Sequence, residues 1–114
     1  MAVRPGSSSM ASVIAVSGPL VIENLFKFQD AWRSDQSQVL IFDFGGLLYM
    51  DSSAIGSLVN AHVHRAKSGR KMALAAVPER VKQLLQVTKV DSLFQFFATV
   101  ADAETALMPG SAHA

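Results

Sequence analysis

The residues with the clearest chemical potential are Asp51, Ser52 and Ser53, which follow an apolar run and precede a segment with helical spacing. The first amides of a helix have no acceptors within it, so a carboxylate or hydroxyl at this point can cap them. The same position suits a phosphorylated serine, because a helix N-terminus carries partial positive charge and unpaired amides. Capping alone explains these residue types, and phosphorylation is the functional alternative.

Other kinds of reactive site find little support. His62 and His64 are two positions apart on a predicted helix and so face different directions, which argues against a shared metal ion. Ser57 lacks the flanking glycines of a nucleophile elbow, and the glycines form neither a Walker A loop nor a dinucleotide fingerprint. The chain has no cysteine, which excludes disulfides, thiolate zinc sites and a cysteine nucleophile. We therefore expect no catalytic residue, metal site, cofactor or enzyme activity, and no small-molecule ligand.

Composition and charge narrow the class of protein further. With 114 residues, 50% of them hydrophobic and 17% charged, the chain is expected to fold as one domain. A net charge of +1 gives no electrostatic footprint for nucleic acid. The densest basic stretch, Arg65, Lys67, Arg70 and Lys71, is interpreted as a solvated helix end. No segment reaches the ~18 apolar residues of a membrane span. We expect a cytoplasmic protein without membrane insertion.

Short apolar runs alternate with amphipathic segments, a pattern typical of an α/β domain with a mostly parallel sheet. A helix after Glu23 is expected to bury Phe26, Phe28 and Trp32 in the core. The expected domain covers residues 12–108, between a flexible leader at 1–11 and a flexible tail at 109–114. The loop 45–53 leaves the carboxyl end of a strand, where function concentrates in such sheets. The predicted strands are 13–16, 39–44, 72–77 and a short one near 93–97, and the predicted helices are 23–34, 52–68, 78–87 and 102–107.

A family resemblance rests on this same region. Phe42-Asp43-Phe44, a short loop, and Tyr49-Met50-Asp51-Ser52-Ser53-Ala54-Ile55-Gly56 resemble the signature of STAS domains, particularly the bacterial anti-sigma factor antagonists. The order of elements from Val13 to Leu107 resembles that family as well. The resemblance implies a mixed, mostly parallel sheet covered by helices, working as a docking module without a catalytic centre.

The resemblance also implies a function. It makes Ser52 the phosphoacceptor, with Ser53 as the alternative, and implies that the unphosphorylated chain binds a GHKL-type anti-sigma serine kinase and so releases sigma factor. A PP2C-type phosphatase is a further partner consistent with such a switch. The competing hypothesis is a STAS adaptor without phosphorylation, in a lipid-transport ABC complex or a signalling assembly. The residues expected to bind the partner are Tyr49, Met50, Asp51, Ser52, Ser53, Ile55 and Gly56.

Overall fold

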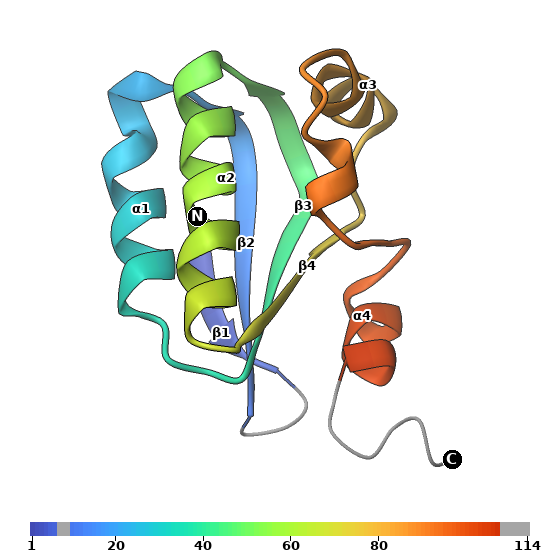
Figure 1. The fold of residues 1–114 in the computed structure, drawn as a ribbon. Helices are drawn as coiled ribbons and strands as arrows, with labels where there is room; N and C mark the ends of the chain where they lie inside the picture. The colour runs from blue at the N-terminus through green and yellow to red at the C-terminus, as the bar shows by residue number, and fades with distance from the viewer. Residues whose placement is uncertain (7–9, 108–114) are drawn as a thin grey trace.

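The computed structural model describes residues 1–6 and 10–107, which form a sheet with helices on both faces (Figure 1). The five strands lie in sequential order, with β1 antiparallel to β2 and all other pairs parallel. The predicted α/β fold with a mixed, mostly parallel sheet is confirmed. The strands are β1 (Ala2–Pro5), β2 (Ala11–Leu20), β3 (Val39–Met50), β4 (Lys71–Ala75) and β5 (Phe96–Phe97). The helices are η1 (Ile22–Asn24), α1 (Leu25–Ser34), α2 (Ser52–Lys67), α3 (Glu79–Val87), η2 (Asp91–Leu93) and α4 (Val100–Leu107).

The apolar side chains of β3 are shared between both faces of the sheet. Leu40, Phe42 and Phe44 join the larger core with α1, α2 and α3, whereas Val39 and Ile41 join a smaller core with α4. This division explains the unbroken apolar run, because a strand covered on both faces has no polar side. Right-handed crossovers between strands in sequential order place α1, α2 and α3 on one face.

Two strands continue through residues that were expected to end them. The sequence predicted that Gly45-Gly46 would stop β3 and that Ser17-Gly18-Pro19 would stop the strand before it. These expectations are wrong, because β2 and β3 pair as far as Leu20 and Met50, with register shifts after Ala15 and Gly18. A Cβ atom at Gly46 would lie 3.0 Å from the Cβ of Ser17, so glycine permits the close pairing there. The expected loop 45–53 therefore reduces to the junction at Asp51.

The N-terminus also differs from expectation. The sequence predicted a flexible leader over residues 1–11, but β1 pairs with β2 from Ala2 opposite Ala15 to Pro5 opposite Ser12. All four residues of β1 are exposed, so the strand is held by backbone pairing and carries no hydrophobic alternation that a sequence could display. Residues 7–9 and the predicted tail at 109–114 lie outside the described residues. The domain limits 12–108 stay a prediction.

The aromatic residues of α1 are divided between core and surface. Phe28 and Trp32 are buried together with Leu25, as helical spacing of three and four residues requires. Phe26 is 77% exposed, which corrects the expectation that it lies in the core. It follows Leu25 directly, and a one-residue step rotates a side chain by about 100° around the helix, away from the buried face.

Candidate phosphorylation site and partner surface

The carboxylate of Asp51 joins the ends of β2, β3 and α2. Its Oδ1 accepts a hydrogen bond from the amide of Ala54 at 2.9 Å, which makes Asp51 the N-cap of α2. Its Oδ2 accepts one from the amide of Ile22 at 2.9 Å, and its own amide donates to the carbonyl of Leu20 at 3.2 Å. Asp51 therefore fixes the start of α2 against the turn that follows β2.

These hydrogen bonds also stabilise the ionised form of Asp51. The amide of Ala54, followed by that of Ile22, lowers the pKa of the carboxyl from its ordinary value of 3.8. Donors directed at the ionised form stabilise it. The carboxylate, which is anionic at neutral pH with or without this shift, thus keeps its charge to lower pH than an ordinary aspartate.

Ser52 is the first residue of α2 and is exposed, whereas Ser53 is half-buried. Within the described residues, neither hydroxyl forms a hydrogen bond. The sequence allowed any of the three residues at 51–53 to be the cap, and the structure gives that position to Asp51. The hydroxyl of Ser52 is therefore not needed for capping, and the residue is exposed at the start of the helix.

The remaining residues expected to bind a partner are divided between surface and core. Tyr49 and Gly56 are exposed, as Ser52 is. Met50 and Ile55 are buried in the larger core. The reason is geometric, because alternate residues of a strand and successive residues of a helix point in different directions. Leu48 is not among the residues expected to bind the partner, although this neighbour of Tyr49 is 65% exposed.

Sequence reasoning also missed the part played by the turn after β2. The side-chain amide of Asn24 donates to the carbonyl of Pro19, and its oxygen accepts from the amide of Val21, both at 2.9 Å. This closed turn presents the Ile22 amide to Asp51. No local signal reveals the contact, because Ile22 and Asp51 are 29 positions apart in the chain.

Ser57, His62 and His64, which were not expected to form a reactive site, pack against other parts of the fold. Ser57 is buried, and its Oγ accepts a hydrogen bond from the indole nitrogen of Trp32 at 3.1 Å, which joins α2 to α1. His62 packs against the ring of Phe94 and His64 against that of Trp32, so the two histidines have different neighbours. In the described part of the chain, no group of three or more His, Cys, Asp or Glu could hold a metal ion.

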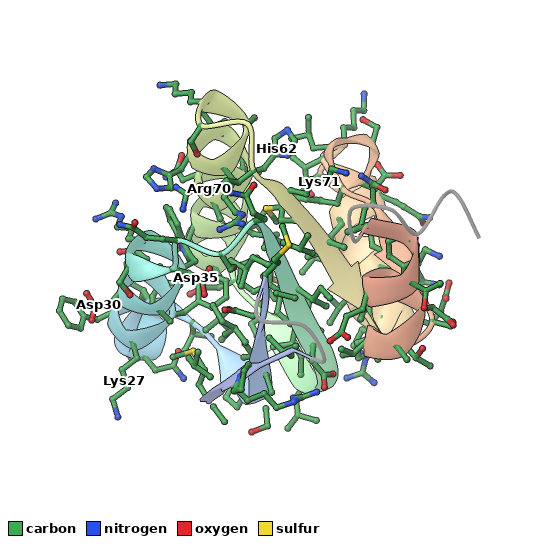
Figure 2. The ribbon with its side chains drawn as sticks, turned by 90° about the horizontal axis from the view of Figure 1, so that it is seen from below. Lys27, Asp30, Asp35, His62, Arg70 and Lys71 are labelled. Atoms are coloured by element: carbon green, nitrogen blue, oxygen red, sulfur yellow. The ribbon has the colours of Figure 1, made fainter. Side chains whose placement is uncertain are left out.

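The basic stretch lies at the other end of α2 from Ser52. Seen from below, Arg70 and Lys71 follow the end of α2, while Lys27 and Asp30 lie on the outer side of α1 (Figure 2). Lys67 and Lys71 are exposed, as a solvated helix end requires. Arg65 departs from this expectation, because its side chain is fully buried.

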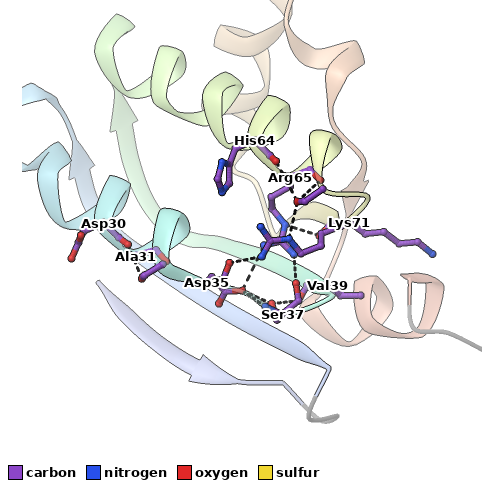
Figure 3. A network of polar contacts seen from close by, with 11 residues as sticks. Asp30, Ala31, Asp35, Ser37, Val39, His64, Arg65 and Lys71 are labelled. Atoms are coloured by element: carbon purple, nitrogen blue, oxygen red, sulfur yellow. Dashed lines mark hydrogen bonds and ion pairs between the residues drawn. The ribbon is translucent and has the colours of Figure 1, made fainter.

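Arg65 holds the chain segments around it by hydrogen bonds. Its guanidinium donates to the carbonyls of Ser37 at 2.6 Å and Lys71 at 3.0 Å, and lies 3.6 Å from the carboxylate of Asp35 (Figure 3). Burial lowers the pKa of Arg65 to about 10, against the opposing effect of Asp35, so it remains charged at neutral pH. The Arg65 guanidinium thus links the end of α2 to the loop between α1 and β3 through its hydrogen bond to Ser37.

Comparison with known proteins identifies the family. The sequence model of the STAS domain family matches residues 3–103, from within β1 to within α4. The chain belongs to the STAS domain family. The resemblance noted in the sequence is thereby confirmed. No helix in the described ranges is both long and apolar enough to cross a membrane.

Several solved structures share the fold. A putative anti-sigma factor antagonist from Thermotoga maritima is 20% identical, with a TM-score of 0.83 over 93% of this chain and 92% of that one. SpoIIAA from Bacillus in its phosphorylated form is 16% identical, with a TM-score of 0.73 over 94% of this chain and 100% of that one. The STAS domain of a SulP transporter from Vibrio cholerae is 25% identical, with a TM-score of 0.67 over 84% of this chain and 78% of that one. The fold thus occurs both in regulators and in a transporter.

Proposed function

We propose that this STAS protein is a cytoplasmic anti-sigma factor antagonist whose binding to a GHKL-type serine kinase is controlled at Ser52. The observation that carries the proposal is the exposed Ser52 hydroxyl at the first position of α2, with capping already supplied by Asp51. The fold is shared with an anti-sigma factor antagonist and with a relative solved in a phosphorylated form, which supports the same reading.

The switch follows from the charge at this position. The kinase transfers the γ-phosphoryl group of ATP to the Ser52 Oγ, ADP leaves, and the hydroxyl proton is released. The product carries about two negative charges at neutral pH. The start of α2 tolerates them locally through its partial positive charge, while the docked partner loses affinity through repulsion and desolvation. The unphosphorylated chain binds the kinase and releases sigma factor, and a PP2C-type phosphatase restores that state. The chain itself performs no catalysis.

A pull-down from native lysate tests the proposal with a matched pair of charge variants. Ser52→Asp adds a carboxylate at the site, and Asn60→Asp adds one on the exposed surface of α2 away from it. We expect the wild type and Asn60→Asp to retain a GHKL-type kinase and Ser52→Asp to lose it, all three being folded by circular dichroism. The retained kinase, incubated with ATP, should phosphorylate the wild type but not Ser52→Ala. If it modifies Ser52→Ala but not Ser53→Ala, Ser53 is the acceptor.

The alternative is a constitutive adaptor subunit of a transport assembly. The 25% identity to the STAS domain of a SulP transporter favours keeping it. In that case Asp51, Ser52 and Ser53 only begin a helix, and aspartate at Ser52 has little effect on binding. Equal capture of transporter subunits by the wild type and Ser52→Asp would establish the adaptor and reject the switch.

A further inference from the structure

A small apolar hollow lies beside the Ser52 site, between the end of β3 and α3. Its volume is about 230 Å³, and its wall is almost entirely apolar. Leu48 and Tyr49 line it from β3, and Val81, Leu84 and Val87 line it from α3, with Arg80 at the same wall. Met50, the last residue of β3, also lines the hollow and lies only two residues before Ser52, the proposed phosphorylation site.

The exposure of its rim is unusual for side chains of this kind. Leu48 is 65% exposed and Val87 is 78% exposed, although both are large and aliphatic. An exposed apolar patch around a hollow is typical of an interaction site. Pockets for drug-sized ligands usually span about 300–1,000 Å³, so this hollow suits anchoring side chains of a protein better than a small molecule.

The charges around the hollow indicate the chemistry of the occupant. Arg80 is exposed and forms no salt bridge within the described ranges, and no carboxylate lines the hollow. A cation beside an apolar cavity is complementary to a segment that carries a carboxylate next to a large apolar side chain.

We propose that this hollow, formed by Leu48, Tyr49, Val81, Leu84 and Val87 with Arg80 beside it, anchors an apolar residue of the partner kinase that is flanked by an aspartate or glutamate. The inference rests on the proposed function and adds to it a second contact next to Ser52. The hollow supplies affinity that does not depend on phosphorylation, and Ser52 supplies the switch. Charge added at Ser52 then acts at the edge of the same interface.

Titrations of the purified kinase test the two parts separately. The probe is the GHKL-type kinase retained by the wild type. The variants are the double variant Leu48→Ser/Val87→Ser and the single variants Arg80→Glu and Ser52→Asp. Val63→Ser is the control, because Val63 is an exposed apolar residue on α2 outside the hollow. We expect the double variant to raise Kd by at least about tenfold, because truncating an anchor in a desolvated pocket has an effect of this size. Arg80→Glu should raise Kd by a similar factor, because it places a negative charge against the acidic residue of the partner. Val63→Ser should remain within about twofold of the wild type. The altered side chains are exposed, so the variants should unfold at nearly the wild-type temperature.

The outcomes separate the hollow from the switch. If Ser52→Asp abolishes binding while the double variant and Arg80→Glu bind like the wild type, the hollow is not a kinase anchor and the proposed function stands. If the wild type binds no such kinase, both proposals fail. Sedimentation that shows a wild-type dimer and a monomeric double variant would assign the hollow to a second copy of this chain and overturn the kinase anchor.

Discussion

The hydrogen bond between Trp32 and Ser57 gives a prediction about how α1 and α2 are held together. Ser57→Ala removes the acceptor of a buried indole N–H and leaves that donor unpaired. An orphaned buried donor costs about 1–3 kcal/mol, and the better helix propensity of alanine returns about 0.5 kcal/mol. The expected net loss in the free energy of unfolding is about 0.5–2.5 kcal/mol. For 114 residues the entropy of unfolding is about 0.24 kcal/mol/K, so Tm should fall by about 2–10 °C.

A double-mutant cycle distinguishes this cause from a general effect of changing Ser57. Trp32→Phe removes the N–H donor, so Ser57→Ala made in that background leaves nothing unpaired. Urea unfolding of the four proteins should show a loss for Ser57→Ala in the wild type that is absent in Trp32→Phe, a coupling of at least about 1 kcal/mol. Equal losses in the two backgrounds would refute the hydrogen-bond argument.

Three further predictions concern other parts of the fold. Arg65→Met leaves the carbonyls of Ser37 and Lys71 without the donor that Arg65 supplies and the Asp35 carboxylate without its ion-pair partner. Urea unfolding should therefore show a loss of about 3 kcal/mol, and a loss below about 1 kcal/mol would contradict the role of Arg65. Gly46→Ala places a Cβ 3.0 Å from the Cβ of Ser17 and should lower the free energy of unfolding by about 1–3 kcal/mol. Gly56→Ala, at an open position within α2, should raise it by up to about 1 kcal/mol. If urea unfolding shows Gly46→Ala to be the more stable of the two, the packing argument is contradicted. Because the folded state lowers the pKa of Asp51, its ionised form stabilises the fold above 3.8, and this contribution is lost as the pH falls through the lowered pKa. The thermal stability of the wild type relative to Asp51→Asn should therefore decrease on acidification, and a difference independent of pH would contradict the assignment.

Most of the fold could be predicted because its periodicities are strong and local. The start of α2 at Ser52 follows from the capping residue types, and the central position of β3 follows from its unbroken apolar run. The extension of β2 and β3 through glycine and proline could not be predicted, because pairing between the two strands overrides weak local propensities there. The same limit applies to β1, which has no buried face.

Arg65 shows that charge can mislead where spacing is informative. Ala54, Leu58, Ala61 and Arg65 recur at steps of three and four residues on the buried face of α2. That spacing predicts burial at position 65 whatever residue type occupies it. What the sequence could not show is that the carbonyls of Ser37 and Lys71 accept hydrogen bonds from this buried guanidinium and that the Asp35 carboxylate lies beside it as an ion-pair partner.

The sequence identified residues 51–53 as the candidate site, but it did not show which of them caps α2. The capping role falls to Asp51 through contacts with Ala54 and Ile22, and the second of these spans 29 positions. The hollow between β3 and α3 could not be predicted either, because it is formed by two separate segments whose apolar residues each resemble ordinary core positions.

The sequential order of β2 and β3 has an electrostatic consequence for the start of α2. Each of these two strands is followed by a helix that runs back along the sheet, so α1 and α2 both begin at the end of the sheet that carries Ser52 (Figure 1). Each helix start contributes the equivalent of about half a positive charge. The backbone of α1 and α2 therefore places partial positive charge at the end of the sheet where Ser52 lies, whereas the full charges of Lys67, Arg70 and Lys71 lie at the opposite end of α2. A negative charge at Ser52 would thus interact with helix amides, whereas one placed past Lys67 would interact with basic side chains.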